Sequence, residues 1–266
     1  MAILNVTPDS FSDGGNLYRD GKLHTDALLR HVDDLVVNGA DLLDIGGEST
    51  RPGAEPVSVS EELDRTMTAI EAVRSRFDVP ISLDSSTAQV MVEGISRGVS
   101  MLNDVRAFQR DGALGVAAAS ELPLCIMHMK GTPKTMQTNP EYQDVVAEVE
   151  SFLLSRRAEL VEAGAAQSNI WFDPGFGFAK TLEHNLSLLN GLPRLAEHAP
   201  LLVGMSKKRM VGEITEREVD ERVVGSAIVG YHALLNGAKI LRVHDVASTR
   251  DAVRIYQALS KHNNSH

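Results

Sequence analysis

Eight short apolar runs of strand length recur along the chain, and segments with helical periodicity separate them. The apolar runs cover residues 2–6, 41–46, 79–84, 100–104, 122–129, 169–173, 200–205 and 239–244. Segment 61–77 carries Leu63 and Met67 at helical spacing, and Ser58 with Glu61 makes a capping box before it. The other long periodic segments cover residues 141–163, 218–236 and 247–261. We therefore predict eight strands with helices between them.

This alternation is typical of the α/β class, and eight strands separated by helices indicate a (β/α)8 TIM barrel. A doubly wound open sheet is the second possibility, although it would need an odd pairing of these elements. No linker, low-complexity stretch or longer repeat interrupts the pattern. We predict a single domain that covers residues 1–266.

The composition limits the partners of this domain. Of its 266 residues, 43% are hydrophobic and 23% are charged, which supplies an ordinary packed core. The net charge of −10 argues against nucleic-acid and anionic membrane partners, because both carry negative charge themselves. An anionic small molecule would therefore need a local cluster of basic side chains.

Cysteine usage and the first residues bear on the compartment. The single cysteine, Cys125, lies in the apolar run 122–129, so an internal disulfide is excluded and a buried, reduced thiol is expected. The first residues lack the basic segment and apolar stretch of a signal peptide. No apolar run approaches the ~20 residues of a membrane-spanning helix. We expect a cytoplasmic protein with no membrane partner.

Polar side chains stand at the end of nearly every predicted strand. The alternation of side chains places the following groups on the inner face of the barrel: Asn5, Asp44, Asp84, Asn103, Asp173, Ser206, Arg242 and His244. Burying so many polar groups without a ligand would cost considerable desolvation free energy. Functional residues of such barrels lie at the carboxyl ends of the strands, so we interpret this set as a functional site.

Basic side chains gather after strands two, seven and eight. Arg51 follows the second strand in a glycine-rich segment, and its guanidinium can bind phosphate or carboxylate through two parallel bonds. Lys207 and Lys208 follow the seventh strand, and Arg242 and His244 end the eighth. The loops after strands seven and eight usually hold phosphate in these barrels, so we predict an anion site there.

Acceptor groups gather on strands three, four and six. Asp84, Asn103 and Asp173 complement the amide and amino-amidine edge of a pyrimidinone, which presents adjacent donors and an acceptor. A pair of catalytic carboxylates is the competing interpretation, and spacing alone does not separate the two. Segment 173–178 adds glycines and aromatic rings but does not match a dinucleotide fingerprint. A Cys/His metal cluster is not indicated, and His128 ends the fifth run, where it can approach the same region.

Five segments, in the same order, closely resemble the dihydropteroate synthases. They are Asn-Val-Thr-Pro-Asp-Ser-Phe at 5–11, Gly-Glu-Ser-Thr-Arg-Pro-Gly at 47–53, Asp-Pro-Gly-Phe-Gly-Phe at 173–178, Gly-Met-Ser at 204–206 and Arg-Val-His-Asp at 242–245. That family joins para-aminobenzoate to 6-hydroxymethyl-7,8-dihydropterin diphosphate and releases pyrophosphate in bacterial folate synthesis. The resemblance implies a Mg²⁺-dependent transferase that is a target of sulfonamides, which compete with aminobenzoate, and that forms a homodimer through its late helices.

The resemblance also implies roles for individual residues. Those expected to bind the pterin are Asp84, Asn103, Asp173 and Lys208. Asn5 would coordinate Mg²⁺ together with the diphosphate, whose oxygens would also be bound by Arg51, Arg242 and His244. The aminobenzoate would be framed by Phe11, Thr50, Pro52, Phe178, Ser206 and Lys207. The residues expected to take part in catalysis are Asn5, Asp13, Arg51, Lys208, Arg242 and His244.

Three features depart from the family pattern. The chain starts directly at its first strand, where the family usually has a hairpin's length of residues, so we expect an uncovered lower end of the barrel. Thr87 stands where relatives commonly have lysine, and Lys207-Lys208-Arg209 replaces the frequent Arg-Lys-Ser. Neither of these two substitutions removes a group assigned to the chemistry, so substrate affinity is the property that they would alter.

The implied reaction is displacement of diphosphate at an exocyclic CH₂ group. The pterin ring can delocalise positive charge as the C–O bond breaks, so we expect a dissociative path that depends on stabilising the leaving group. The amine is neutral near pH 7 and needs no general base. The alternatives are a pterin-binding methyltransferase that uses methyltetrahydrofolate, which has no need of the anion site, and a non-catalytic pterin-binding paralogue.

Overall fold

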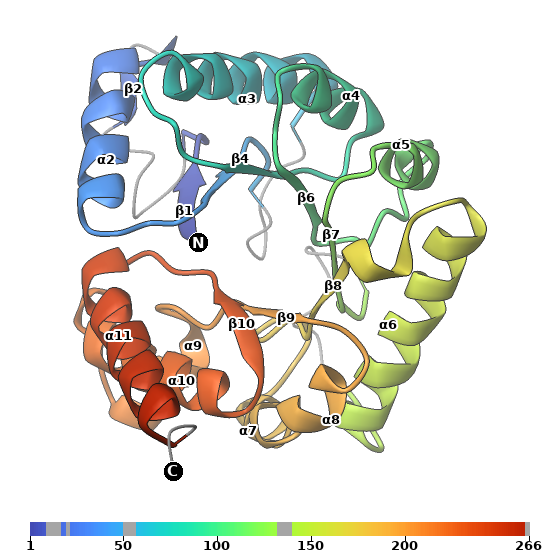
Figure 1. Cartoon of the computed structure of the whole chain (residues 1–266), viewed down its shortest axis with the longest axis vertical. Coiled ribbons are helices and arrows are strands. Elements are labelled where there is room, and N and C mark those ends of the chain that lie inside the picture. Colours follow the sequence, from blue (N-terminus) through green and yellow to red (C-terminus); the bar gives the residue numbers. More distant parts are fainter. Residues whose placement is uncertain (9–16, 20–21, 50–56, 132–139, 264–266) are drawn as a thin grey trace.

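The computed structural model describes residues 1–8, 17–19, 22–49, 57–131 and 140–263. Eight parallel strands form one sheet in chain order (Figure 1). They are β1 (Ala2–Asn5), β4 (Leu43–Gly46), β5 (Ile81–Asp84), β6 (Met101–Asp104), β7 (Leu124–Met127), β8 (Ile170–Asp173), β9 (Leu201–Val203) and β10 (Ala238–Leu241). Each lies inside one of the predicted apolar runs except β10, which begins one residue earlier. The runs exceed the strands because they include residues that lead in or out without ladder pairing.

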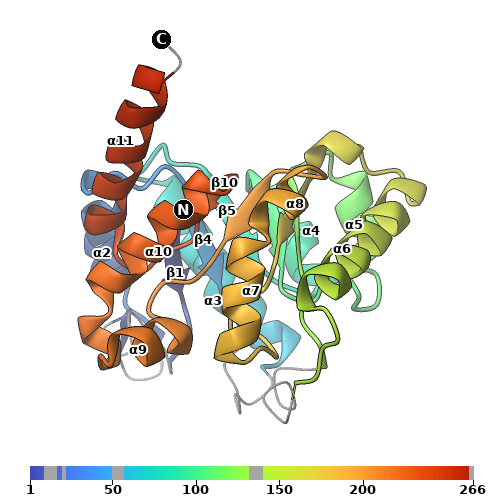
Figure 2. The same ribbon diagram turned by 90° about the horizontal axis from the view of Figure 1, so that it is seen from below.

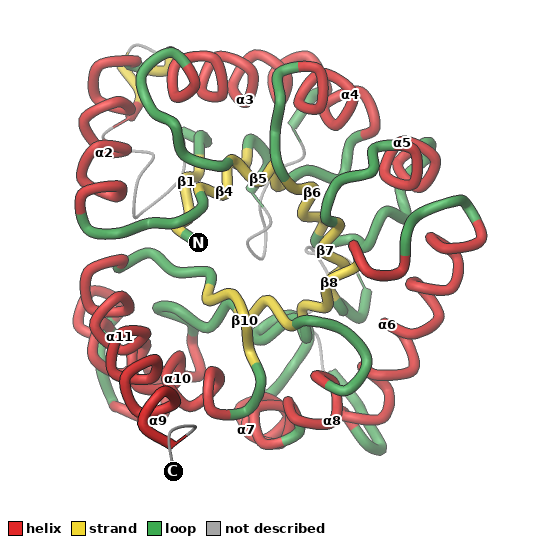
Figure 3. Tube along the Cα trace, viewed as in Figure 1, coloured by secondary structure: helices red, strands yellow, loops and turns green. Residues whose placement is uncertain are grey.

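The sheet closes on itself. A parallel bridge joins Ala2 to Val243, the Ile3 amide donates to the Val243 carbonyl at 2.9 Å, and the Val243 amide donates to the Met1 carbonyl at 3.0 Å. The strands thus form an inner ring with the helices outside it (Figure 3). The predicted barrel is confirmed, and the open-sheet alternative is wrong because the first and last strands are connected.

The helices follow the predicted alternation. They are α2 (Thr25–Val37), α3 (Val59–Arg74), α4 (Ala88–Ser96), α5 (Ala113–Ala119), α6 (Val145–Glu162), α7 (Leu182–Asn190), α8 (Leu192–Ala196), α9 (Arg209–Thr215), α10 (Val223–Leu235) and α11 (Val246–Asn263). Short 3-10 turns lie at η1 (Gln167–Asn169) and η2 (Val219–Glu221), and a two-residue ladder joins β2 (Tyr18–Arg19) to β3 (Lys22–Leu23). Figure 2 shows α11 extending beyond the rest of the ribbon. No helix of the described residues combines the length and hydropathy needed to cross a bilayer.

One predicted helix start is confirmed by the structure and another is wrong. The capping box of α3 is confirmed, because the Glu61 amide donates to Ser58 Oγ at 3.3 Å and the Ser58 amide donates to Glu61 Oε2 at 3.2 Å. The predicted start at residue 141 was too early. Asp144 Oδ1 accepts from the amides of Val146 and Ala147, both at 3.0 Å, and so begins α6 there.

Two separate apolar clusters hold the barrel together. The large one lies between the strands and the surrounding helices, while a small one fills the inside of the barrel. The inner cluster has Met101, Cys125 and Leu202 at its centre, with Trp171 and Ile240 packed against them. Cys125 is fully buried as predicted, and burial raises the pKa of its thiol, so it stays uncharged and apolar in character.

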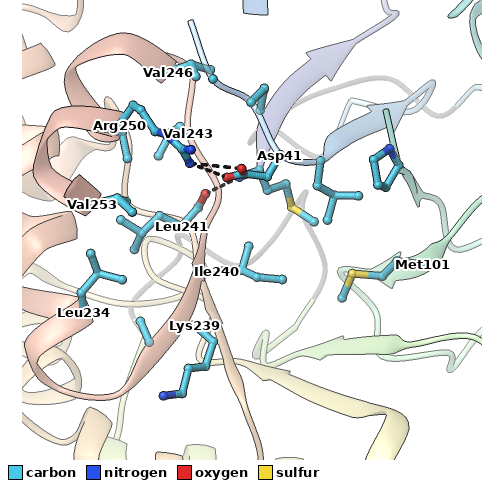
Figure 4. A pocket seen from close by; sticks show the side chains of 18 of the residues that line it. Asp41, Met101, Leu234, Lys239, Ile240, Leu241, Val243, Val246, Arg250 and Val253 are labelled. Atoms are coloured by element: carbon cyan, nitrogen blue, oxygen red, sulfur yellow. Dashed lines mark hydrogen bonds and ion pairs between the residues drawn. The ribbon is translucent and has the colours of Figure 1, made fainter. Parts of the chain in front are cut away.

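The lower end of the barrel, where the strands begin, contains an open cavity of about 710 Å³ (Figure 4). Met101, Ile240 and Leu241 are among its mostly apolar lining residues. The Arg250 guanidinium pairs with the Asp41 carboxylate at 3.0 Å, and both of these residues also line the cavity. The expectation that this end is uncovered because a hairpin is missing stays a prediction.

Candidate active site

The opposite end of the barrel, where the strands finish, is called the mouth below. Asp84, Asn103 and Asp173 are near or at the last positions of β5, β6 and β8, and Asp44 lies two residues before the end of β4. Strand register pairs Asp84 with Asn103, so these side chains are neighbours. The structure therefore brings the predicted acceptor groups to one end of the barrel.

Arg242 joins two of the mouth carboxylates. Its Nε donates to Asp44 Oδ2 at 2.5 Å and its Nη2 donates to Asp84 Oδ2 at 2.7 Å. The Asp44 side chain is fully buried and that of Asp84 is 12% exposed. Burial and the charge of Asp44 raise the pKa of Asp84, while the guanidinium of Arg242 opposes this rise. Positive charge at Arg242 is thus what allows two carboxylates to lie together at this depth.

Asn103 completes this group. Its Nδ2 lies 3.2 Å and 3.3 Å from the two oxygens of Asp44, and its side chain is almost completely buried. Residues 44, 84, 103 and 242 come from four different strands or strand ends. We call these four residues the Arg242 cluster.

A second charged group lies beside the loop that follows β8. Lys208 Nζ donates to the carbonyl of Phe176 and lies 4.6 Å from the centroid of the Phe178 ring. Burial lowers the pKa of Lys208 to about 8, and the neighbouring Asp173 carboxylate opposes this. Gly177 has φ +78°, and a Cβ there would lie 3.1 Å from Lys208 Cδ, so glycine allows this close approach.

The two adjacent lysines have different partners. Lys207 Nζ lies 3.7 Å from Asp220, a residue whose side chain is 91% exposed, whereas Lys208 lies against the β8 loop. Lys207 has a φ of +57°, a left-handed conformation that separates the directions of the two side chains. Its ammonium therefore lies beside an acidic group, and its expected contact with aminobenzoate stays a prediction.

Ser206 follows β9 and His244 follows β10, and the two side chains lie together. Ser206 Oγ accepts from the His244 amide at 3.2 Å and lies 3.2 Å from His244 Nδ1. Ser206 is buried and His244 is half-buried. Two members of the predicted inward set are thus in contact.

The sequence missed a buried pair behind the mouth. Lys180 Nζ lies 3.0 Å from His128 Nδ1 and donates to the carbonyls of Gly175 and Phe178 at 3.0 Å and 3.1 Å. Burial lowers the pKa of Lys180 to about 7 and that of His128 to about 3, so the imidazole is neutral. The pair anchors the loop that carries Phe178. A lysine next to the first residue of a helix is usually exposed to solvent. No local sequence pattern therefore indicated that Lys180 is buried.

Thr87, one of the departures from the family pattern, lies in a buried polar network. Its Oγ1 donates to Glu62 at 2.7 Å and accepts from Arg110 Nη1 at 3.1 Å. Arg110 also pairs with Glu48 at 2.9 Å, as does Arg106. A threonine here is therefore fully bonded, and Arg110 supplies positive charge next to it.

Several predicted site residues lie outside the described part of the chain. They are Phe11, Asp13, Thr50, Arg51 and Pro52. Asn5 ends β1 and is half-buried. Among the described residues there is no group of three or more His, Cys, Asp or Glu side chains that could enclose a metal.

Comparison with known proteins identifies the family. A model described as pterin binding enzyme matches residues 1–244. The dihydropteroate synthase of Haemophilus influenzae is 48% identical over 259 residues, which is 97% of this chain and 92% of that protein. The dihydropteroate synthase of Escherichia coli is 46% identical over 264 residues, covering 97% of this chain and 90% of the relative.

Solved structures agree. The Yersinia pestis dihydropteroate synthase in a sulfonamide drug complex has a TM-score of 0.93 and 46% identity, covering 98% of this chain and 93% of that one. The Xanthomonas albilineans enzyme in complex with 7,8-dihydropteroate has a TM-score of 0.84 and 41% identity, covering 97% and 92%. Since the family model and both curated relatives span nearly all of the sequence, the chain belongs to the dihydropteroate synthase family of pterin binding enzymes.

Proposed function

We propose that this chain is a transferase that condenses 6-hydroxymethyl-7,8-dihydropterin diphosphate with para-aminobenzoate to give 7,8-dihydropteroate and pyrophosphate. The observation that carries the proposal is the set of acceptors and cations at the mouth, in a chain 41% identical to an enzyme solved with 7,8-dihydropteroate. A methyltransferase or a non-catalytic paralogue would not account for the names of the relatives.

The pterin is held by the acceptor side of the mouth. Asp84, Asn103 and Asp173 present carboxylate and amide oxygens to the amino-amidine edge, and Lys208 donates to a ring acceptor. Burial strengthens each of these bonds, because water does not compete for the groups. A carboxylate that accepts from ring N–H groups also disfavours analogues with an oxygen in place of the amino group.

The diphosphate is held on the opposite side. Arg242 uses Nε and Nη2 on Asp44 and Asp84, and neither pair uses its Nη1, which is the group we assign to a phosphoryl oxygen. His244 and, from the segment outside the described residues, Arg51 complete the anion site. These groups donate to the phosphoryl oxygens and stabilise the negative charge that develops on the leaving group.

Mg²⁺ would be held by Asn5 together with diphosphate oxygens. The lack of an acidic cluster among the described residues fits such a site, since Mg²⁺ often keeps several waters and binds through one or two protein groups and substrate phosphates. When bound, the ion supplies positive charge to the leaving group. Asn5, at the end of β1, offers a neutral amide oxygen for this purpose.

The chemistry then needs positioning more than proton transfer. Phe178 and Ser206, with Lys207, Phe11, Thr50 and Pro52, frame the aminobenzoate so that its neutral amine faces the CH₂ carbon. The pterin ring delocalises charge while the C–O bond breaks. His128, the buried histidine near this region, is bonded to Lys180 and serves the loop instead of acting as a base.

A homodimer would form through the outer face of the late helices. Val224, Ile228 and Leu235 lie on one face of α10, at 68%, 62% and 59% exposure, and Ile255 and Leu259 are exposed on α11. The two helices pack against each other, so these side chains belong to one side of the molecule. Ile228→Glu should shift the chain to monomer in light scattering, and an unchanged mass would contradict this interface.

Pyrophosphate release tests the function directly. The purified chain, supplied with the pterin diphosphate, para-aminobenzoate and Mg²⁺, should release pyrophosphate and form 7,8-dihydropteroate, and a sulfonamide should inhibit competitively with aminobenzoate. Release that needs no aminobenzoate, or no release by the folded chain, would contradict the proposal. The cytoplasmic location expected from the sequence stays a prediction, which fractionation of expressing cells would test.

A further inference from the structure

Asp44 has no role in the reaction described so far, although it lies at the centre of the Arg242 cluster. Its carboxylate is fully buried and contacts two residues assigned to the substrate. Oδ2 accepts from Arg242 Nε at 2.5 Å, and both oxygens lie within 3.3 Å of Asn103 Nδ2. Strand β4 places it two residues below the rim, so Asp84 lies nearer the mouth than Asp44 does.

We propose that Asp44 is a positioning residue that fixes the orientation of the Asn103 amide and of the Arg242 guanidinium, and so determines which hydrogen-bonding pattern the site accepts. The inference rests on the proposed function and deepens it. It assigns specificity for an amino-substituted ring to a residue that lies beneath the site.

The orientation of the Asn103 amide follows from the chemistry of the two groups. Both Asp44 oxygens lie within 3.3 Å of Asn103 Nδ2, and carboxylate oxygens accept hydrogen bonds, so the Asn103 NH₂ is the side that faces Asp44. Asp44 Oδ2 also accepts from Arg242 Nε. Asn103 Oδ1 therefore points to the other side, and no donor of the described residues bonds to it. Asn103 is thus set to accept from an N–H group of the ligand.

The two carboxylates orient the guanidinium of Arg242 in a similar way. Nε and Nη2 lie on one edge of the planar group, and that edge is occupied by Asp44 and Asp84. With both carboxylates in place the plane of the group is fixed, and Nη1 is directed away from them. Without Asp44, Nε loses its acceptor, and the group can rotate about its bond to Cδ toward Asp84 alone.

A purely structural ion pair predicts different behaviour. Buried pairs often contribute little net stability, and a neutral replacement that packs well can be tolerated. In that case substitution would change the melting temperature and leave substrate discrimination as it was. Discrimination between ring patterns is therefore the decisive measurement.

The test is Asp44→Asn, which keeps the shape and removes the charge. The Asn103 amide can then adopt either of its two flipped orientations, because the new amide at position 44 offers both a donor and an acceptor. The probes are 6-hydroxymethyl-7,8-dihydropterin diphosphate and the corresponding lumazine, which has oxygen in place of the amino group. We expect the ratio of kcat/KM between pterin and lumazine to fall at least about tenfold, a loss on the scale of one hydrogen bond to a charged group.

The matched control is Asp104→Asn. Asp104 is equally buried at the end of strand β6, next to Asn103 in the chain, but its side chain accepts from the amides of Arg106 and Phe108 at 2.8 Å and 2.7 Å and is bonded to neither the Arg242 nor the Asn103 side chain. This variant should lower the melting temperature and keep the pterin-to-lumazine ratio of the wild type. If Asp44→Asn does not fold, Asp44→Ser removes the same charge with less bulk.

A double-mutant cycle with Asn103→Ala completes the design. If Asp44 acts through Asn103, Asp44→Asn should have little further effect on the ratio once Asn103 is alanine. An unchanged ratio in folded Asp44→Asn, or equal effects in both backgrounds, would overturn the inference. Inactive wild-type protein would contradict the proposed function itself, so the two failures are distinguishable.

Discussion

The two ends of the barrel are built from the same eight strands and have opposite character. Met101 and Asn103 lie on one strand, two residues apart and on the same face, yet Met101 belongs to the inner apolar cluster and Asn103 to the Arg242 cluster. The lower end opens into a mostly apolar cavity with an ion pair, Asp41–Arg250, among its lining residues. A strand four residues long is thus enough to separate a structural layer from a chemical one.

The clearest contrast is between the two arginine–aspartate pairs. Arg242 contacts carboxylates whose side chains are 0% and 12% exposed, whereas the Asp41 partner of Arg250 is 74% exposed. A buried pair cannot lose one member without leaving an uncompensated charge, while water compensates an exposed one. The comparison indicates that similar pairs stabilise the two ends by different amounts. Five experiments, from the largest expected effect to the smallest, test this difference and the other buried groups of the barrel.

The largest effect is expected from Arg242→Met. It leaves two buried carboxylates without a cation, so the free energy of unfolding should fall by roughly 3–5 kcal/mol. Loss of a donor to the leaving group should lower kcat by at least about 100-fold. Arg250→Met is the matched control and should change stability by less than about 1 kcal/mol in urea titrations. Equal losses in the two variants would remove the distinction between the ends.

The second-largest effect is expected in pterin binding. Asp84→Ala should keep the barrel folded, since Arg242 retains Asp44, and should weaken pterin binding by roughly 2–4 kcal/mol in calorimetry. Asp41→Ala, at the other end, should bind the pterin as the wild type does. Normal pterin affinity in folded Asp84→Ala would contradict the assignment of this carboxylate to pterin binding.

The third experiment measures how the lowered pKa of Lys180 makes the free energy of unfolding depend on pH. Burial lowers its pKa from 10.5 to about 7, so between these values the folded chain holds fewer protons than the unfolded chain. Unfolding then takes up a proton, and stability rises with pH by about 2 kcal/mol from pH 7 to pH 9. Lys180→Met should lose this part of the slope, and Lys239→Met, at an exposed position on β10, should keep it. Parallel slopes for all three proteins would contradict the assignment.

The fourth concerns the charge of Lys208. Burial lowers the pKa of Lys208 to about 8, so its ammonium is charged below that pH and loses its charge above it. Affinity for the pterin diphosphate should therefore decrease roughly fivefold between pH 8 and pH 9. Lys208→Arg keeps its charge throughout this range and should show a flat profile. A wild-type profile that is flat as well would indicate another donor.

The smallest effect belongs to the inner apolar cluster. Cys125→Ala removes a fully buried sulfur and should lower the free energy of unfolding by about 1 kcal/mol. Cys125 is paired in register with Asn103 but makes none of the hydrogen bonds of the Arg242 cluster, so kcat and KM should stay at their wild-type values. A kinetic change with this substitution would show that the two layers are coupled.

Much of this architecture could be predicted from local patterns. The strands lie where apolar runs predict them, and the inward set at their ends includes every member of the Arg242 cluster. Alternation along a strand is a local property, so the side on which a residue lies follows from its position alone. The same holds for the capping box at Ser58, whose members are three residues apart.

Partners between elements could not be predicted in this way. Arg242 and Asp44 are 198 residues apart, and Lys180 and His128 are 52 apart, so each contact depends on the register of several strands and on closure of the barrel. Lys207 and Lys208 show the same limit at short range, because one left-handed residue sends two adjacent ammonium groups to different partners. The sequence by itself determined which polar groups face inward at the mouth. Only the tertiary structure decided which of them are bonded to one another, since that depends on distances between strands that no local pattern encodes.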